Sequence, residues 1–426
     1  MIRADLVIVD AAQLLTLKGP APRRRESLKD LSLIEGGCLA ARGGRIVFAG
    51  TRDQFEAEVA LDDPADVIDA SDRVVMPGFV DCHTHLPFAG SREQEFARRL
   101  AGASYQEIAA AGGGIMSTVR ATRAATDEEL LDAVLQRMDR MLLEGTTTCE
   151  AKSGYGLTVA DELRLLRVLA RASELHPVDI VPTFLGAHTV PAEMKDRRDS
   201  YVRMVIEEMI PAVSAERIAE YCDVFCEKGA FTVEESRRIL QAGSAAGLKP
   251  RLHADQLTSC GGAELAAELG AASADHLERA SDDGLRSLAR AGVTGVLLPG
   301  ASFCMREAHW APARRMIELG VAPALATDLN PGTCNTESMQ LMLALACLKM
   351  DLGVEEAIVA STLNAAITIG RNETVGTLEP GRAADLIVLD VPSYLHLVYR
   401  PGINHVNTVV KKGATVVRDR LLSYDS

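Results

Sequence analysis

The sequence predicts an α/β protein in which a (β/α)8 TIM barrel carries a small β-sandwich domain formed by the N- and C-terminal segments. Two observations lead to this fold class. Apolar strands alternate with amphipathic helices through the middle of the chain, and short β-branched runs occupy both ends. Because 426 residues exceed one simple core, we expect a composite β domain of residues 1–74 and 377–426 and a barrel of residues 75–376.

The two terminal segments are each too short to bury a core alone. Residues 5–9 and 45–49 are apolar, β-branched runs, and similar runs return at residues 384–389 and 408–410. A sheet shared by both ends of the chain would give all of these strands partners.

The barrel is expected from eight apolar segments. The predicted strands are residues 75–80, 146–150, 180–185, 221–226, 249–253, 272–276, 295–298 and 323–326. Helical periodicity is clear in residues 127–143, 161–175, 233–246 and 262–269. Eight strands alternating with helices over about 300 residues favour a closed barrel over an open sheet.

A pair of histidines, His83 and His85, follows the first predicted strand. Side chains of an extended segment alternate between faces, so these two point the same way and can bind one metal ion. Two structural histidines are the alternative interpretation. The apolar run that leads into the pair places it at a strand end, where functional residues gather, and this favours the metal site.

Three more polar residues close other predicted strands: His253, His276 and Asp328. The carboxyl ends of barrel strands meet at one mouth, so we expect these residues close to His83 and His85. Imidazole nitrogen and carboxylate oxygen suit Zn²⁺ or Fe and leave a place for water. Such an ion lowers the pKa of bound water toward neutrality and makes hydroxide available.

Arg92 is a candidate for binding an anionic substrate. It lies just beyond the histidine pair, and its planar guanidinium matches a carboxylate in a protein whose formal charge of −14 repels acids. A surface ion pair with Glu93 or Glu95 is the alternative.

Tyr155 and His188 would face the same opening. Tyr155 lies in the segment 152–156 after a strand end, where flanking glycines permit unusual backbone angles. His188 follows the strand at residues 180–185 and could polarise a substrate carbonyl.

Composition argues against several classes of protein. The net charge of −14 does not suit a nucleic-acid partner, and no stretch reaches the roughly 18 apolar residues of a membrane-spanning helix. Nine cysteines without a CxxC pair, and a charged N-terminus unlike a signal peptide, predict free thiols in a reducing cytoplasm. The triplet Gly112-Gly113-Gly114 lacks the remainder of a phosphate-binding loop and is expected to be a lid or a tight turn.

With these motifs assembled, the chain resembles the amidohydrolase superfamily, and within it the imidazolonepropionase family of ring-opening hydrolases in histidine degradation. The resemblance covers nearly the whole chain. Its most specific segments are residues 77–85, 110–115, 152–157, 184–188, 273–277 and 326–332.

The resemblance implies a site and a reaction. It implies one Zn²⁺ or Fe ion bound by His83, His85, His253 and Asp328, a substrate held by Arg92, Tyr155 and His188, and a pocket completed by Asn330, Gly332 and Thr333. The reaction would be hydrolysis of the cyclic amide of 4-imidazolone-5-propanoate to N-formimino-L-glutamate by a homodimer. Asp328 would orient the water and move its proton, and His276 would steady the developing charge.

One position departs from the pattern, because Gln256 stands where some relatives carry a glutamate. An amide cannot transfer protons at neutral pH, so Gln256 can only hydrogen-bond the ring or the water. Proton transfer therefore falls to Asp328.

Two competing interpretations stay open. A deaminase on the same barrel would attack an exocyclic amine, but a neutral base gives Arg92 no carboxylate to bind. A non-enzymatic binding protein on this fold would have little need for the full set of ligand residues.

Overall fold

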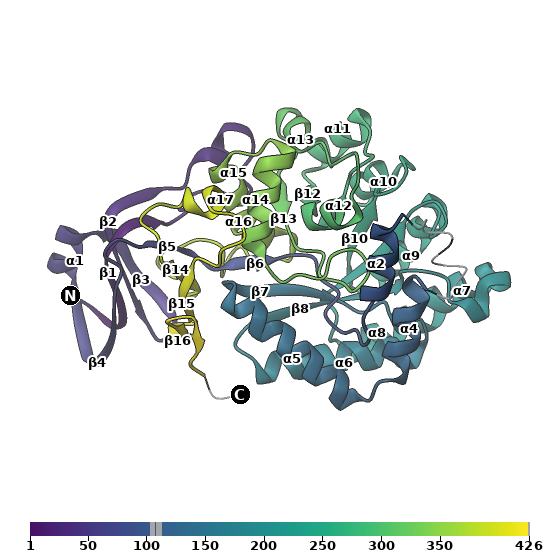
Figure 1. Cartoon of the computed structure of the whole chain (residues 1–426), viewed down its shortest axis with the longest axis horizontal. Coiled ribbons are helices and arrows are strands. Elements are labelled where there is room, and N and C mark those ends of the chain that lie inside the picture. The colour runs from purple at the N-terminus through teal and green to yellow at the C-terminus, as the bar shows by residue number, and fades with distance from the viewer. Residues whose placement is uncertain (103–106, 108–112, 425–426) are drawn as a thin grey trace.

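A computed structural model describes residues 1–102, 107 and 113–424 of the chain. Its strands form two sheets (Figure 1): an eight-stranded parallel sheet curved into a barrel, and a nine-stranded mixed sheet at one end of the molecule. The mixed sheet takes its strands from both ends of the chain. The predicted barrel is therefore present, as is a β domain built from both ends of the chain.

The barrel strands follow one another in chain order, and each is parallel to its neighbours. They are β6 (Phe79–Asp81), β7 (Thr146–Lys152), β8 (Asp179–Ala187), β9 (Tyr221–Cys226), β10 (Lys249–Ala254), β11 (Ser273–His276), β12 (Thr294–Leu297) and β13 (Pro323–Leu325). Seven of the eight predicted strands match these bounds within two residues.

The first predicted strand is wrong in one respect. Residues 75–80 form two strands, β5 (Val74–Pro77) in the mixed sheet and β6 in the barrel, with Gly78 between them. A Cβ atom at Gly78 would lie 2.4 Å from the side chain of Thr147, so only glycine lets the chain pass here. We propose Gly78, rather than residue 75, as the point where the chain leaves the β domain.

Helices surround the barrel between its strands (Figure 1). They include α4 (Ile115–Ala124), α5 (Asp127–Leu143), α6 (Val159–Leu175), α7 (Arg198–Met204), α8 (Ile210–Glu216), α9 (Val233–Ala245), α10 (Gly262–Glu268), α11 (Asp282–Ala291), α12 (Pro299–Met305), α13 (Ala313–Leu319), α14 (Met339–Met350), α15 (Val354–Ala360) and α16 (Leu363–Thr368). A further helix, α2 (Glu93–Leu100), follows the histidine pair. None of the helices among the described residues is long and apolar enough to cross a bilayer.

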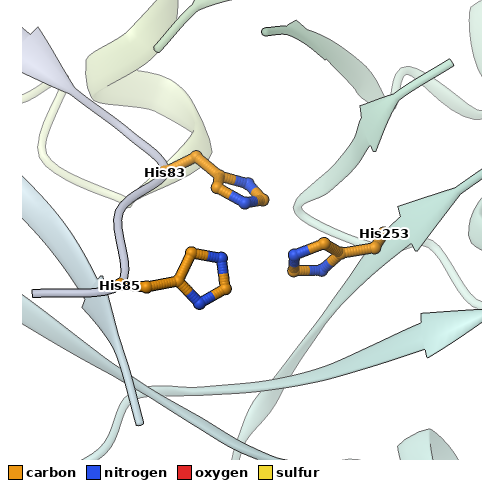
Figure 2. A group of neighbouring side chains, drawn as sticks. All are labelled: His83, His85 and His253. Atoms are coloured by element: carbon orange, nitrogen blue, oxygen red, sulfur yellow. The ribbon is translucent and has the colours of Figure 1, made fainter. Parts of the chain in front are cut away.

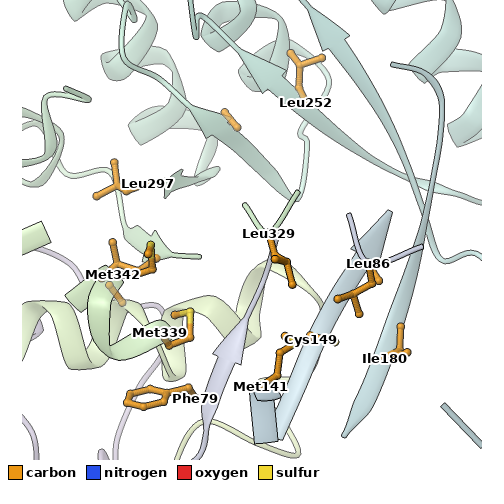
Figure 3. Close-up of a cluster of buried hydrophobic side chains, with 14 of the residues drawn as sticks. Phe79, Leu86, Met141, Cys149, Ile180, Leu252, Leu297, Leu329, Met339 and Met342 are labelled. Carbon is orange, nitrogen blue, oxygen red and sulfur yellow. The ribbon is translucent and has the colours of Figure 1, made fainter. Parts of the chain in front are cut away.

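Helix α5 illustrates why these segments are helical. Thr126 and Glu129 form a capping box at its start, and the buried residues Leu130, Val134 and Met138 recur every four positions. The resulting apolar stripe packs on the barrel. Figure 3 shows the core between strands and helices, where Phe79, Met141, Cys149, Ile180, Leu252, Leu297 and Met342 are buried together.

The mixed sheet joins the two ends of the chain. Its other strands are β1 (Ile2–Leu15), β2 (Leu33–Arg42), β3 (Arg45–Thr51), β4 (Val59–Asp69), β14 (Leu386–Leu389), β15 (Val406–Lys411), β16 (Ala414–Arg418) and β17 (Leu421–Leu422). Strand β5 pairs with β1 on one side and with β14 on the other, and residues such as Leu6, Ile8, Leu386 and Val410 share a separate core. The predicted sandwich is therefore one continuous mixed sheet.

Candidate active site

Four histidines meet at the carboxyl ends of the barrel strands. His83 and His85 follow β6, His253 lies in β10 and His276 ends β11. The ring centroid of His83 is 4.6 Å from that of His253, 5.4 Å from that of His85 and 5.7 Å from that of His276. Figure 2 shows His83, His85 and His253 converging on a common space. All four side chains are buried.

The barrel closes at these residues. Strands β6 and β13 are not paired along their length, but the amide of Asp328 donates to the carbonyl of His83 (3.0 Å) and the amide of His85 donates to the carbonyl of Leu329 (2.9 Å). These bonds hold the histidine pair beside Asp328. The Asp328 carboxylate Oδ1 lies 3.4 Å from His85 Nε2 and 3.6 Å from His83 Nε2.

The nitrogen atoms of this cluster fit a metal ion. His83 Nδ1 lies 2.6 Å from Asp275 and His253 Nδ1 lies 3.1 Å from Asp223, and a carboxylate only accepts, so each Nδ1 donates and each Nε2 keeps its lone pair. His83 Nε2, His253 Nε2 and His85 Nδ1 are buried without a hydrogen-bond partner. Ligand atoms of these three histidines lie within 4.8 Å of one another, as do those of His83, His276 and Asp328. Such a donor set suits Zn²⁺ or Fe.

Burial and charge set the ionisation of the cluster. Burial, with Lys152 and the other histidines, holds the pKa of His83 well below its usual value, and burial also lowers the pKa of His85. Burial opposes ionisation of Asp328, but the hydrogen bond from His85 and the nearby histidines outweigh it and lower the pKa of that carboxyl. His83 and His85 are therefore neutral imidazoles and Asp328 is an ionised carboxylate, the forms that bind metal.

His276 differs from the other histidines in the sign of its shift. Burial alone would lower its pKa, but Glu278, whose Oε1 lies 3.7 Å from His276 Nδ1, and Asp328 together raise it. His276 is thus the imidazole in this cluster that most readily carries a positive charge.

His188 and Tyr155 lie next to His85. The His188 ring is 5.1 Å from that of His85 and 5.3 Å from that of Tyr155, and His188 Nδ1 is 3.0 Å from the carbonyl oxygen of Gly154. Because that oxygen can only accept, Nδ1 donates and Nε2 is available as an acceptor. Both predicted residues therefore lie beside the histidine cluster.

Arg92 forms one of the two suggested contacts, the ion pair with Glu95, and its guanidinium also reaches Gly332. Its guanidinium forms an ion pair with Glu95 at 2.8 Å, and Nη1 lies 2.2 Å from where a Cβ atom of Gly332 would be. A side chain at position 332 would displace this arginine. Glycine there lets Arg92 approach the loop that follows Asp328.

Asn330 organises that loop through its own side chain. Its Oδ1 accepts from the amides of Gly332 and Thr333 at 2.8 Å each, and its Nδ2 donates to Thr333 Oγ1 at 2.7 Å. Thr333 Oγ1 in turn donates to Asp328 Oδ2 at 3.3 Å. The side chain of Asn330 is therefore used within the loop, where it keeps Thr333 against Asp328.

Gln256 is half-buried on the loop after β10, and its neighbours are anchored by two carboxylates. Asp255 accepts from the amides of Cys260, Gly261 and Ala263, and Glu227 accepts from the amide of Leu257. These bonds order the loop that carries Gln256.

Sequence reasoning missed a set of charged residues beneath the histidines. Lys152 was expected at the mouth, but it is the last residue of β7 and its side chain is fully buried inside the barrel. Its surroundings are charged as well, since Glu150, Asp223, Arg251 and Asp275 are also fully buried. The signal was present, because charged residues within apolar strands are almost never buried without partners.

Glu162 was missed as well. This buried residue of α6 accepts from the amides of Gly154 and Gly156 at 2.9 Å each and from that of Leu157 at 2.7 Å. It therefore shapes the loop that carries Tyr155. Of the predicted glycine triplet, Gly112 lies outside the described residues, as do residues 110 and 111, and Gly114 precedes α4 with a φ of 77°.

The model of the amidohydrolase family matches residues 74–416, which include every residue of the cluster. The chain belongs to the amidohydrolase family. The predicted resemblance to the superfamily is thus confirmed, and the protein is an amidohydrolase by sequence and by fold.

Curated relatives place this amidohydrolase more closely. The chain is 52% identical to imidazolonepropionase from Symbiobacterium thermophilum over 414 residues, which cover 97% of each sequence. It is also 52% identical to imidazolonepropionase from Geobacillus kaustophilus, over 97% of this chain and 98% of that one. The chain is therefore a member of the imidazolonepropionase group.

Solved structures share the fold at low identity. A zinc-bound adenosine deaminase from Xanthomonas campestris has a TM-score of 0.74 at 18% identity, over 100% of this chain and 95% of that one. Atrazine chlorohydrolase from Arthrobacter aurescens, complexed with zinc, has a TM-score of 0.71 at 16% identity, over 99% of this chain and 97% of that one. At this identity the likeness concerns the fold alone.

Proposed function

We propose that this enzyme hydrolyses the cyclic amide of 4-imidazolone-5-propanoate to N-formimino-L-glutamate. The main support is the placement of a buried cluster with free imidazole nitrogens beside Arg92, Tyr155 and His188. The first group suits activation of water, and the second suits an anion attached to a polar ring. The relatives from Symbiobacterium thermophilum and Geobacillus kaustophilus are both named imidazolonepropionase, which fits this substrate.

We assign one Zn²⁺ or Fe ion to His83, His85, His253 and Asp328. The support is the set of buried nitrogen atoms without partners and the ionised Asp328 carboxylate, which lies close to Nε2 of His83 and of His85. When bound, the ion would supply the Lewis acidity that makes a water molecule nucleophilic at neutral pH.

Asp328 would transfer the proton in this reaction, and His276 would stabilise the developing charge. The water oxygen bonds to the ring carbonyl carbon, the adjacent carbon–nitrogen bond breaks, and the nitrogen takes a proton. Asp328 would accept the proton from the water and deliver it to the leaving nitrogen, because its carboxylate is ionised and Thr333 orients Oδ2. His276, whose pKa is raised, would stabilise the negative charge on the carbonyl oxygen.

The remaining predicted residues would bind and orient the substrate. Arg92, fixed on one edge by Glu95, would present its other edge to the propionate, and the Tyr155 hydroxyl would bind the same group. His188 and Gln256 would hydrogen-bond the ring. The loop that Asn330 orders, with Gly332 and Thr333, would close the pocket beside Arg92.

The test is turnover of freshly generated imidazolone propionate, followed by loss of its ultraviolet absorbance with and without a chelator. Rapid loss that needs metal, with N-formimino-L-glutamate as product, supports the proposal. If a metal-loaded sample leaves imidazolone propionate intact, this compound is excluded as the substrate. Turnover of an aminated purine or pyrimidine instead would favour a deaminase.

We further propose that the enzyme is a cytoplasmic homodimer. All nine cysteines are free thiols in the structure, which fits a reducing compartment. A dimer would give a light-scattering mass of twice the 45.6 kDa of one chain. A mass of one chain across the working concentration range would rule it out.

A further inference from the structure

Lys152 lies at the centre of a buried set of charges beneath the histidine cluster. Its ammonium Nζ is 2.7 Å from Glu150 Oε1, 2.9 Å from Asp223 Oδ2 and 3.9 Å from Asp275 Oδ2. These carboxylates come from three different barrel strands, β7, β9 and β11. One ammonium group therefore links three strands across the inside of the barrel.

Two of these carboxylates each hold a histidine of the proposed metal site. Asp223 lies 3.1 Å from His253 Nδ1, and Asp275 lies 2.6 Å from His83 Nδ1. In both cases the carboxylate accepts from Nδ1 and thereby turns Nε2 toward the cluster. The two histidines come from β10 and from the end of β6, far apart in the chain, and Lys152 contacts both of their partners.

The third carboxylate holds the segment between the two paired histidines. Glu150 Oε2 accepts from the amide of Thr84 at 3.2 Å, and the Lys152 amide donates to the Thr84 carbonyl at 2.9 Å. Thr84 separates His83 from His85. Each carboxylate that Lys152 contacts thus supports a different part of the site.

We propose that Lys152 is a positioning residue of the metal site, which fixes His83, Thr84 and His253 through Asp275, Glu150 and Asp223. This inference rests on the metal site of the proposed function. Lys152 itself touches no solvent, because its side chain is fully buried and its ammonium faces carboxylates. Contact with substrate is therefore not its role.

The charge of Lys152 explains why this position needs an ammonium group. Glu150, Asp223 and Asp275 are enclosed together, and the second positive charge, Arg251, forms a close ion pair with Asp275 at 3.1 Å while acting on Glu150 and Asp223 from a greater distance. Without the ammonium, Glu150 and Asp223 would repel each other in a medium that screens charge poorly. They would move apart or admit water, and the His253 ring and the Thr84 backbone would lose their fixed supports.

The chain offers a matched control in Lys411. This lysine is also buried between two carboxylates, with Asp385 at 2.5 Å and Asp179 at 2.8 Å. It belongs to β15 of the mixed sheet, and Asp179 begins β8 at the end of the barrel opposite the histidines. Replacing Lys411 therefore removes an equivalent buried ion pair away from the site.

The experiment compares Lys152→Met with Lys411→Met in the full chain. Zinc affinity of the metal-free proteins is measured by competition with a chromophoric chelator, and the d–d absorption of the cobalt-substituted proteins reports the ligand geometry. We expect Lys152→Met to weaken zinc binding by about 10- to 100-fold, the usual cost of losing an outer support of a ligand, and to shift the cobalt spectrum. Lys411→Met should retain the wild-type affinity and spectrum.

The outcomes separate this inference from the proposed function. If the wild-type protein takes up no zinc, the proposed metal site itself fails. If the wild type binds zinc and Lys152→Met binds it equally well, the positioning role is overturned. It is also overturned if Lys411→Met loses as much zinc affinity as Lys152→Met. Lys152→Gln, an uncharged donor of similar length, serves if the methionine variant does not fold. If neither variant folds while Lys411→Met does, Lys152 is a general structural residue and the inference also fails.

Discussion

The imidazole of His188 stacks on that of His85, with ring centroids 5.1 Å apart and an interplanar angle of 21°. His85 follows β6 and is buried, whereas His188 follows β8 and is half-buried. Burial, followed by the influence of His85 and His253, holds the pKa of His188 well below its usual value. The folded protein therefore keeps His188 neutral at a pH where the unfolded chain binds a proton.

This difference predicts acid sensitivity of the metal-free protein. Below about pH 6.5 the unfolded chain protonates His188 and the folded chain does not. The free energy of unfolding therefore decreases as the pH is lowered, by at most about 1.4 kcal/mol per pH unit for one such group. Above that pH the contribution is complete. Urea unfolding between pH 7 and 5 should show a shallower dependence for His188→Asn. The exposed His309→Asn serves as control, and equal slopes in all three proteins would contradict the prediction.

Arg92→Ala should raise KM by about tenfold or more and change kcat little. The propionate would lose a charge-assisted hydrogen bond worth about 1.5–3 kcal/mol in ground state and transition state alike. Steady-state kinetics on imidazolone propionate measure this split. Arg98→Ala, on the exposed face of the same helix α2, should leave KM unchanged. An unaltered KM in Arg92→Ala would remove this residue from the pocket.

Asp328→Asn should lower kcat by about 10²- to 10⁴-fold, the range expected when a group that transfers a proton is lost. Metal content, measured in parallel, tells whether the ion is lost as well. Asp351→Asn is a suitable control, because Asp351 is exposed and has the positive φ of 59° that asparagine tolerates. Near-normal kcat in Asp328→Asn would overturn its assignment.

Glu162→Gln should destabilise the protein by about 1–3 kcal/mol and raise KM. An amide group presents one acceptor oxygen where the carboxylate receives three backbone N–H groups, so at least one donor loses its partner. The loop that carries Tyr155 would then lose its fixed shape. Urea unfolding and kinetics check both effects against Glu174→Gln, an exposed position on the same helix. A variant with wild-type stability would show that Glu162 does not hold the loop.

Removal of metal should abolish turnover reversibly. Dialysis against a chelator would leave His83, His85 and His253 with buried nitrogens that lack partners, while the fold keeps its hydrogen bonds. Elemental analysis should find the ion gone, circular dichroism should be unchanged, and Zn²⁺ or Fe²⁺ should restore activity. Full turnover by a sample verified to be free of metal would contradict the proposed site.

Local pattern in the sequence was sufficient for most of the architecture. The strand Tyr221–Cys226 and the helix Asp127–Leu143 have the predicted bounds, because apolar periodicity and capping residues act over a few positions. The sequence also predicted, for a related reason, that five residues of the site lie together: His83, His85, His253, His276 and Asp328. The barrel rule places the ends of parallel strands at one mouth, whatever the loops between them.

The tertiary structure decided what depends on distant residues. The break at Gly78 follows from the approach of Thr147, which no local pattern records. Whether Lys152 faces the mouth or the barrel interior depends on the register of β7 within the closed sheet, and its three carboxylates lie up to 123 positions away in the chain. The sequence alone thus determined which residues end the strands, whereas packing determined which buried charges hold them in place, because only the folded barrel brings those charges within bonding distance.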